Sequence, residues 1–422
     1  MTVPRKNILV VHPSKHTYVY EVAVALQTHG RLLRFVTGIY DKRDCWFSRV
    51  ARSASLIARP DQIERLLSRR RHHAIDDAEV TTWPVAELLS RTVGRWRPVE
   101  VLTRERSGYL FVNWWFDRAV ARALRSGRYR PDAVYGFLGA ALHTFAACRE
   151  LGIRTILDVP IILSAADTMA EERRAAKLTA GLASSPNRHI ARELAAADWI
   201  VAPAAAVVES IRATGYQGGV SEVPFGADVE AFQPGPLRSG PFRVVYAGRI
   251  EPRKGAHHLV EAWHKARTPG ELLLVGSAPD AEFIRGLRQQ YGGTVREAGN
   301  VTTAELARLF ADADVFALPS LAEGSALVTY EALAAGLPCI VTHETGSVVR
   351  DGIEGFIVPT RAPDVLAARI RELHDNVALR RRMSLAARAR AEEFSWKSYH
   401  ERVVAAIDLA LTSTSSTQPA VA

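Results

Sequence analysis

The chain has 422 residues, 48% of them hydrophobic and 23% charged, which is typical of a globular protein and excludes a largely disordered or collagen-like chain. Because domains usually hold about 100–200 residues, this length predicts two domains. The formal net charge is +9, and residues 1–150 hold 25 Lys and Arg against 14 Asp and Glu. This excess, which includes "RLLSRRRHH" (65–73) and "RWRPVE" (95–100), predicts either an anion-attracting surface or a solvated arginine-rich face.

Cysteine use and hydropathy indicate the compartment. The three cysteines, Cys45, Cys148 and Cys339, are far apart and have no C-x-x-C spacing, so neither a disulfide framework nor a structural zinc site is expected. No apolar run reaches the length of about 18 residues that a membrane span needs. The N-terminal run "ILVV" is too short for a secretory signal. We therefore expect a cytoplasmic protein, at most peripheral to the inner face of the cytoplasmic membrane.

The first half of the chain alternates short apolar runs with helical patterns. After the apolar run 6–13, the residues Val19, Val22, Ala23 and Leu26 recur at i, i+3, i+4 and i+7, which indicates a helix. A second apolar run follows at 31–39, and strand, helix and strand in that order predict a parallel sheet covered by helices. Further strands are predicted over 131–139, 153–162 and 199–204. Three further helices are predicted: one over 141–152, one that ends near residue 198, and one over 207–215.

A Gly- and Pro-rich stretch over 223–241 interrupts this alternation and predicts a domain boundary. The alternation then restarts, with strands predicted over 242–248, 271–276, 294–299, 314–320, 338–343 and 354–359, and helices over 256–267, 281–291, 303–313, around Glu331 and over 363–374. The predicted fold class is α/β, with doubly wound domains over 1–225 and 242–394 and a linker over 226–241. A C-terminal helix over 395–411 and a disordered Ser/Thr tail over 412–422 complete this division.

Two motifs in the second half lie where strands are predicted to end, which is where open α/β sheets bind ligands. The first, "GRIEPRKG" (248–255), places Arg249 and Lys254 between two glycines at the opening of a helix. Two cations near a helix N-terminus favour a phosphate or pyrophosphate. The motif is neither Walker A nor GxGxxG, so neither P-loop nor nicotinamide chemistry is indicated. The alternative interpretation is an exposed basic turn.

The second motif is "LAEGSALVTYEALAAGLPCIV" (321–341), which holds two glutamates eight positions apart. Glu323 is predicted in the loop after a strand and Glu331 inside the next helix, so both carboxylates can reach one ligand. A glutamate among Ala, Leu and Tyr is costly to bury without a partner, and sugar or ribose hydroxyls would suit it. The alternative is that Glu331 faces solvent. Backbone N–H groups at this helix N-terminus are expected to be free for an anion; they belong to Gly324, Ser325, Ala326 and Leu327.

Together these segments resemble the donor-binding half of family 4 glycosyltransferases, which have the GT-B fold. The resemblance rests on "GRIEPRKG", "ADVFALPSLAEGSALVTYEALAAGLPCIVT" and "VRDGIEGFIVP", supported by "ELAAADWIVAPAAAVVESIRATG", "VPFGADVEAFQP" and "FSWKSYHERV". It covers roughly residues 190–410. It implies two Rossmann-like domains that face each other across a cleft, with a C-terminal helix that crosses back to the first domain.

The resemblance also implies a role for each donor-side residue. Arg249 and Lys254 match the cations that bind the donor diphosphate. Glu323 matches the first glutamate of the E-x7-E motif, which holds the transferred sugar near the reacting carbon, and it is therefore a catalytic candidate. Glu331 matches the second glutamate, which binds the ribose. The family is retaining and uses a nucleotide-diphospho-sugar without a metal or other cofactor. One departure is Ala326, which stands where the family commonly has a glycine and narrows the backbone freedom of the loop.

The acceptor side resembles the family less. "HPSKHTY" (12–18) replaces a glycine-rich loop, and "YGFLG" (135–139) and "LDVPI" (157–161) lack histidines that many members carry. Asp158 is the catalytic candidate in their place, or else an ordinary strand-end carboxylate, and His143 is expected to be a satisfied core or surface histidine. The aromatic run over 109–120 is expected in the core, with a sugar-stacking or membrane-interface patch as the alternative. The candidates for acceptor contact are His12, Ser14, Lys15 and His16.

The predicted function is transfer of a sugar from a nucleotide-diphospho-sugar to an envelope glycan or lipid-linked glycan, with no nucleic-acid partner. An epimerase on the same scaffold would need further acid/base residues in the cleft. A phosphorylase of the pyridoxal phosphate type would need a cofactor lysine that the sequence does not single out. A non-catalytic sugar- or nucleic-acid-binding relative is the alternative from another class. The complete set of donor-side residues argues against it.

Overall fold

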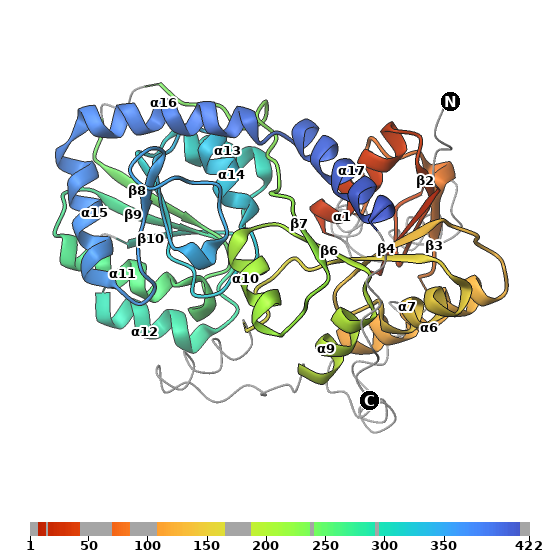
Figure 1. Cartoon of the computed structure of the whole chain (residues 1–422). Helices are drawn as coiled ribbons and strands as arrows, with labels where there is room; N and C mark the ends of the chain where they lie inside the picture. The colour runs from red at the N-terminus through yellow and green to blue at the C-terminus, as the bar shows by residue number, and fades with distance from the viewer. Residues whose placement is uncertain are drawn as a thin grey trace, which may run out of the picture.

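The computed structural model describes residues 7–13, 16–42, 70–84, 108–164, 187–236, 240–291 and 295–413. It contains two parallel α/β sheets, one in each half of the chain, which lie side by side (Figure 1). The N-terminal sheet has seven strands in the order β3-β2-β1-β4-β5-β6-β7, and the C-terminal sheet has six in the order β10-β9-β8-β11-β12-β13. If the strands of each domain are numbered from 1 in chain order, both sheets contain the strand order 3-2-1-4-5-6, which is that of doubly wound dinucleotide-binding folds. The predicted fold class is confirmed.

The N-terminal domain is built around strands that are buried on both faces. Its strands are β1 (Ile8–His12), β2 (Leu32–Thr37), β3 (Val80–Thr82), β4 (Ala133–Phe137), β5 (Arg154–Asp158), β6 (Trp199–Ala202) and β7 (Gly219–Glu222). Its helices are α1 (Thr17–Thr28), α6 (Gly108–Arg125), α7 (Leu142–Leu151), α9 (Asn187–Ala196) and α10 (Ala205–Ala213), with a short 3-10 helix, η1 (Asp77–Glu79). Alternate residues of β1 enter different cores: Val10 packs in the cluster that includes α1, and Val11 packs with α6, α7, α9 and α10.

The C-terminal domain repeats this construction. Its strands are β8 (Arg243–Ala247), β9 (Glu271–Val275), β10 (Val295–Gly299), β11 (Val315–Leu318), β12 (Cys339–Val341) and β13 (Gly355–Ile357). Its helices are η2 (Pro252–Lys254), α11 (Ala256–Ala266), α12 (Ala281–Tyr291), α13 (Thr303–Ala311), α14 (Leu327–Ala334), η3 (His343–Thr345), α15 (Pro363–Asp375) and α16 (Val377–Glu393). The strands β3 and β7, the helices α6 and α16 and the short 3-10 helices were not predicted from the sequence.

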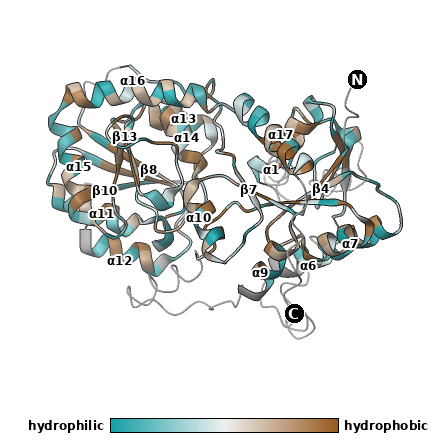
Figure 2. Ribbon diagram, viewed as in Figure 1, coloured by the Kyte–Doolittle hydropathy of each residue, from teal (hydrophilic) through white to brown (hydrophobic). Residues whose placement is uncertain are grey.

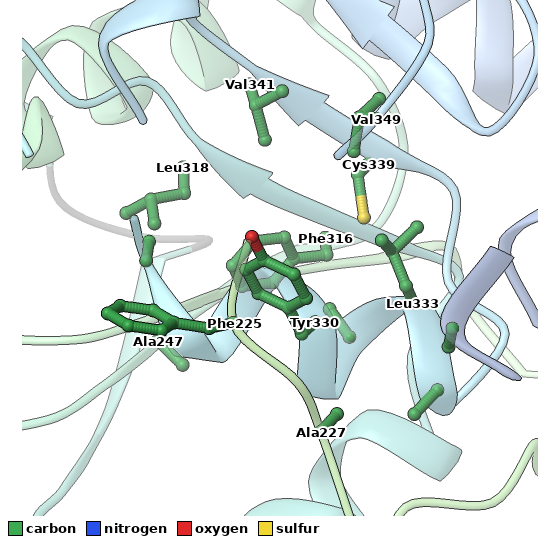
Figure 3. Packing of buried hydrophobic residues seen from close by; sticks show 14 of the residues in the cluster. Phe225, Ala227, Ala247, Phe316, Leu318, Tyr330, Leu333, Cys339, Val341 and Val349 are labelled. Atoms are coloured by element: carbon green, nitrogen blue, oxygen red, sulfur yellow. The ribbon is translucent and has the colours of Figure 1, made fainter. Parts of the chain in front are cut away.

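Hydrophobic residues concentrate along the strands of both domains (Figure 2). One buried cluster continues from the C-terminal sheet through the linker to the α1 side of the N-terminal sheet. Figure 3 shows the part of this cluster around α14, where Tyr330 and Leu333 of α14 pack near Phe316 of β11, with Phe225 and Ala227 of the linker alongside. The two domains therefore share a continuous apolar connection.

Helix α17 (Trp396–Thr412) carries the chain back from the C-terminal domain and packs on α1 (Figure 1). At the crossing, the backbone N–H of Ala227 donates to the carbonyl of Phe394 at 3.0 Å, and the N–H of Trp396 donates to the carbonyl of Ala227 at 3.3 Å. The linker and the returning segment therefore run side by side. On the N-terminal domain, Asp408 of α17 forms an ion pair with Arg31.

A buried carboxylate also ties α17 to the N-terminal domain. Glu21 of α1 is paired with His400 of α17, Nε2 to Oε2 at 2.7 Å, and with His72, Nε2 to Oε1 at 3.2 Å. Burial alone would raise the pKa of Glu21, but the hydrogen bonds to His400 and His72 lower it below the ordinary value of 4.5. Glu21 therefore stays ionised between the two imidazoles.

The described part of the basic run, residues 70–73, serves the fold. Arg70 is buried, Arg71 lies 3.5 Å from Asp77, and His72 belongs to the Glu21 cluster. The prediction of an exposed basic surface is wrong for Arg70, whereas His73 is exposed, and "RWRPVE" lies outside the described residues. The aromatic run is divided between the two interpretations, because Phe116 is buried as expected for core, Trp115 is half-buried and Trp114 is 42% exposed. None of the helices within the described ranges is long and apolar enough to cross a membrane.

We predict that Glu21→Gln lowers the free energy of unfolding by roughly 1–3 kcal/mol at pH 7, because the charge-assisted hydrogen bonds to two imidazoles are weakened. The folded-state pKa of Glu21 is depressed, so its contribution is present above the ordinary value of 4.5 and is lost as the pH falls through the folded-state value. Urea denaturation at pH 7 and pH 4 measures this. The difference from wild type should narrow at pH 4, and the exposed Glu230→Gln is the matched control. An equal difference at both pH values would contradict the interpretation.

Candidate active site in the interdomain cleft

A cleft with a volume of about 580 Å³ lies between the two domains. The strands β8 and β11 are neighbours in the C-terminal sheet, although β9 and β10 separate them in sequence. Their carboxyl ends therefore mark the topological switch point, where such sheets bind ligands. The C-terminal domain lines the cleft with the loops that follow these two strands, with α14 and with residues near β9 and β10. The N-terminal domain and linker contribute His16, Tyr18, Pro160, Ile161 and Phe225.

The loop after β8 brings Lys254 to this cleft. The loop ends in the short helix η2, and Gly255 follows with φ +67°. A Cβ atom on Gly255 would lie 1.9 Å from the carbonyl oxygen of Pro319, so a glycine is needed for η2 to pack against the end of β11. Lys254, at the end of η2, lines the cleft.

Glu323 lies in the loop after β11, as predicted, and each of its carboxylate oxygens contacts a cation. Arg253 Nη1 is 2.7 Å from Oε1, and Lys254 Nζ is 2.7 Å from Oε2. Burial would raise the pKa of Glu323, but the charges of Lys254 and Arg253 hold it below the ordinary value. Glu323 is therefore an anion that lines the cleft.

Arg249 takes a different position from the one predicted. Its side chain is 59% exposed and lies 3.3 Å from Glu251 Oε2, and it is not among the residues that line the cleft. Of the two predicted cations, the structure brings only Lys254 into the cleft. Arg253 lies in the same motif, but sequence reasoning missed it, because the register of the 3-10 turn decides which arginine faces Glu323.

Glu331 lines the cleft from within α14, so the interpretation as a solvent-facing residue is wrong. Its carboxylate has no hydrogen bond or ion pair with any of the described residues. Burial, with a smaller contribution from the charge of Asp228, raises the pKa of Glu331 to about 7. The group has an unmet need for hydrogen-bond partners that a ligand can supply.

The loop between the two glutamates was predicted to offer free N–H groups. The N–H of Ala326 instead donates to the carbonyl of Thr345 at 3.1 Å, so that part of the prediction is wrong. The N–H groups of Gly324, Ser325 and Leu327 have no partner within the described residues. The backbone of Ala326 is extended, with φ −77° and ψ 100°, so an alanine replaces the family's glycine there without strain.

Gly324 also brings the domains into contact. A Cβ atom at this position would lie 1.5 Å from the carbonyl oxygen of Pro160, and the N–H of Ile162 donates to the carbonyl of Glu323 at 3.0 Å. Both partners follow β5 of the N-terminal domain. The glycine therefore lets the donor-side loop touch the opposite wall of the cleft.

The acceptor-side candidates separate in the structure. His16 lines the cleft, whereas His12 is buried with its ring 4.9 Å from that of Phe137, and Ser14 and Lys15 lie outside the described residues. His143 is satisfied as expected, with Nδ1 2.8 Å from Asp117 Oδ2.

Asp158 does not reach the cleft. It is 2% exposed, and the hydroxyl of Tyr135 donates to its Oδ2 at 2.6 Å. Burial raises the pKa of Asp158 to about 7 even though this hydrogen bond lowers it. Asp158 is not among the residues that line the cleft, so the structure gives no support to its prediction as a catalytic group. Across the described ranges, no group of three or more His, Cys, Asp or Glu side chains is arranged to hold a metal ion.

The far end of the cleft was not predicted from sequence. It is lined by Val275, Gly276, Asn300, Val301 and Leu306 from the ends of β9 and β10 and the start of α13. Apolar side chains next to a polar one suit a flat heterocycle. The sequence could have indicated these residues, because most of them follow predicted strands, and the same criterion identified the two motifs.

Comparison with known proteins agrees with this geometry. Residues 229–390 match the family described as "Glycosyl transferases group 1". The phosphatidyl-myo-inositol mannosyltransferase of Mycobacterium tuberculosis is 32% identical over 189 residues, which cover 42% of this chain and 50% of that protein. The D-inositol 3-phosphate glycosyltransferase of Paenarthrobacter aurescens is 31% identical over 202 residues, with 42% and 48% covered. The chain thus spans about half the length of the curated relatives it matches.

Solved structures match over both domains. Sucrose-phosphate synthase from Thermosynechococcus elongatus has a TM-score of 0.64 at 18% identity, with 97% of this chain and 100% of that chain covered. HepE of Anabaena in complex with UDP-glucose has a TM-score of 0.60 at 17% identity, with 96% and 99% covered. At these identities the likeness shows the fold. The second domain of this chain therefore belongs to the glycosyl transferases group 1 family, and the chain as a whole has the GT-B fold.

Proposed function

We propose that this protein is a glycosyltransferase that takes a sugar from a nucleotide-diphospho-sugar. The observation that carries the proposal is the pair of carboxylates in the cleft: Glu323 is held by cations, and Glu331 has no partner among the described residues. The likeness to HepE, which was solved with UDP-glucose, supports a donor of this class.

The cleft suggests a place for each part of the donor. The diphosphate lies near Lys254 and the N–H groups of Gly324, Ser325 and Leu327, where the positive end of α14 adds to the cation. Glu331 accepts hydrogen bonds from the ribose, which stabilise the charged form of its carboxylate. Glu323 accepts hydrogen bonds from the sugar. The base lies at the far end, beside Val301 and Leu306.

We further propose a retaining transfer that needs no metal ion. Negative charge develops on the departing β-phosphate oxygen, and Lys254 with the N–H groups of the loop stabilises it in place of a metal. Glu323 is ion-paired and has a lowered pKa, which makes it a poor nucleophile and a poor base. It therefore orients the sugar and does not attack it. The bond from the anomeric carbon to the β-phosphate oxygen breaks, the acceptor oxygen bonds from the same face, and its proton passes to the departing oxygen.

The proposed acceptor is an envelope glycan or glycolipid. The relative named phosphatidyl-myo-inositol mannosyltransferase supports a lipid acceptor, whereas the one named D-inositol 3-phosphate glycosyltransferase points to a small phosphorylated inositol as the competing class. A transfer assay with each donor against phosphatidylinositol, inositol phosphate and a neutral glycan distinguishes the acceptor classes.

We also propose peripheral contact with an anionic membrane through α6. Arg118 stacks 5.0 Å from the ring of the exposed Trp114, and a nearby hollow combines Trp83 and Trp115 with Arg122 and Arg128. Tryptophan and arginine together suit the interface of a bilayer with anionic head groups.

We predict that Lys254→Met weakens donor binding at least about a hundredfold, because a desolvated charge pair with the diphosphate is lost. Thermal shift and calorimetry with UDP-, GDP-, ADP- and dTDP-sugars in the presence of EDTA measure this. The matched control is Lys265→Met, an exposed lysine of α11 in the same domain. Failure of all four donors to stabilise the wild type would reject the proposed function, and transfer that requires a divalent metal would reject the metal-independent mechanism.

We predict that Glu331→Gln separates stability from binding. The pKa of Glu331 is raised to about 7 from 4.5, so the empty wild-type protein loses stability as the pH rises between these values. Glutamine removes this loss, and the melting temperature of the empty variant should exceed that of wild type at pH 8 but not at pH 4. Donor affinity should fall about tenfold or more at pH 8. Glu401→Gln, at an exposed position of α17, is the control; a Glu331→Gln protein that melts below wild type at pH 8 would contradict the assignment.

We predict that Trp114→Ser combined with Arg118→Ser reduces binding to phosphatidylglycerol vesicles at least about fivefold, because both an interfacial ring and a cation are removed. Cosedimentation at low and high salt measures it, with phosphatidylcholine vesicles as the neutral reference. Arg308→Ser, on α13 of the other domain, is the control. Equal binding of wild type to both lipids would reject membrane contact of this kind.

A further inference from the structure

Five charged side chains of alternating sign form a chain beside the cleft. Glu251 lies 3.3 Å from Arg249 and 3.0 Å from Arg253, and Glu323 lies 2.7 Å from both Arg253 and Lys254. Four of the five belong to the loop after β8, and Glu323 belongs to the loop after β11. The chain therefore links the proposed phosphate site with the carboxylate that is proposed to hold the sugar.

The two cations on Glu323 differ in what surrounds them. Arg253 is fixed on several sides: its Nη1 also donates to the carbonyl of Ala322 at 2.9 Å, and its Nη2 donates to Glu251 Oε1 at 3.0 Å. It is not among the residues that line the cleft. Lys254 does line the cleft, and its ammonium group contacts Glu323 Oε2. One cation is thus fixed behind the carboxylate, and the other faces the ligand.

This difference matters when a donor binds. A diphosphate that reaches Lys254 competes with Glu323 for the same ammonium group. Both are anions, and the flexible stem of lysine lets the ammonium group move from one to the other. Once Lys254 moves to the diphosphate, Glu323 Oε2 becomes open to a sugar hydroxyl. Glu323 Oε1 stays bonded to Arg253, whose planar guanidinium is held by two further acceptors.

We propose that Arg253 is a positioning residue, which holds Glu323 by one carboxylate oxygen so that Lys254 can leave the other oxygen for the donor diphosphate. This inference rests on the proposed function and extends it. It makes sugar binding depend on prior occupation of the diphosphate site, since Oε2 is covered until Lys254 leaves. Glu251 weakens the hold of Arg253 on Glu323, because the guanidinium contacts both carboxylates.

The charge of Arg253 also determines the state of Glu323 after the exchange. With Arg253 present, the largely buried carboxylate stays ionised and accepts a hydrogen bond from a sugar hydroxyl. Without Arg253, burial would favour the protonated acid, which donates in place of accepting. Other titratable side chains on the elements around Glu323 are Tyr246 of β8, Glu331 of α14, Glu344 of η3 and His16 across the cleft, besides Arg249 and Glu251.

The test compares Arg253→Met, Arg253→Lys and Glu251→Gln with the wild-type protein. Calorimetry measures binding of the nucleoside diphosphate alone, and donor hydrolysis or transfer measures kcat from pH 4 to pH 9, a range that reaches below the ordinary pKa of 4.5 for Glu323. Arg253→Met should bind the nucleoside diphosphate within about threefold of wild type, because Lys254 and the loop N–H groups remain. Its kcat should fall about tenfold or more at pH 6 and recover toward pH 9, since one pKa unit corresponds to a tenfold change. Arg253→Lys should restore part of the loss.

Glu251→Gln provides a change of opposite sign, and it keeps the proposal testable if Arg253→Met does not fold. Glutamine removes the negative charge that Glu251 places beside Arg253, so the pKa of Glu323 should fall and the acidic limb of the kcat profile should move to lower pH. Either of two results would overturn the proposal: an equal loss of kcat by Arg253→Met at every pH, or an acidic limb that Glu251→Gln leaves in place. If wild-type protein binds no nucleoside diphosphate, the proposed function itself fails, and that result is distinct because it needs no variant.

Discussion

The site depends on the ion pairs that Glu323 makes with Arg253 and Lys254. These contacts join the loop after β8 to the loop after β11, and both loops leave the sheet at its topological switch point. Buried ion pairs add little net stability, because desolvation offsets the attraction. What they contribute here is geometry: two oxygens of one carboxylate fix the positions of two cations. A diphosphate meets Lys254 beside its own site, so the ammonium group has only to move from Glu323 Oε2 to the phosphate, which limits the ordering that binding requires.

The position of the opposite wall depends on the crossing between the domains. The linker and the start of α17 exchange backbone hydrogen bonds at Ala227, and α17 continues to the N-terminal domain, where His400 meets Glu21. A second contact between the domains is made at Gly324, because its lack of a side chain lets the loop after β11 touch the carbonyl of Pro160. The width of the cleft is therefore set by contacts on both of its sides.

The sequence predicted the donor side well and the acceptor side poorly, for physical reasons. Periodicity and turn residues identify strands and the loops that follow them, which placed Lys254, Glu323 and Glu331 at one edge. The direction of a side chain within a tight turn depends on local register, so the roles of Arg249 and Arg253 could not be separated. Asp158 ends a strand as predicted, but its neighbour Tyr135 holds it inside the sheet layer.

Three of the missed elements, α16, β3 and β7, share a weak apolar signal. Helix α16 buries Leu379, Met383, Ala387 and Ala391, one residue every four positions, and two of these are alanines in a run rich in arginine. Strand β3 has three residues, and the edge strand β7 is half-exposed and begins with glycine. In each case pairing or packing with distant residues forms the element, and local periodicity does not reveal it.

The two glutamates of the cleft come eight positions apart in one sequence motif, yet the fold gives them opposite electrostatic states. The pKa of Glu323 is held low by two cations, and the pKa of Glu331 is raised to about 7 by burial without a counter-charge. The first carboxylate is satisfied by protein cations before any ligand arrives, whereas the second has no protein partner within the described residues. The stability that the empty protein loses at Glu331 is thus recovered when ribose hydroxyls donate to it, and this recovery adds to donor affinity. A fold that satisfied both groups internally would be more stable when empty and would hold the donor less tightly.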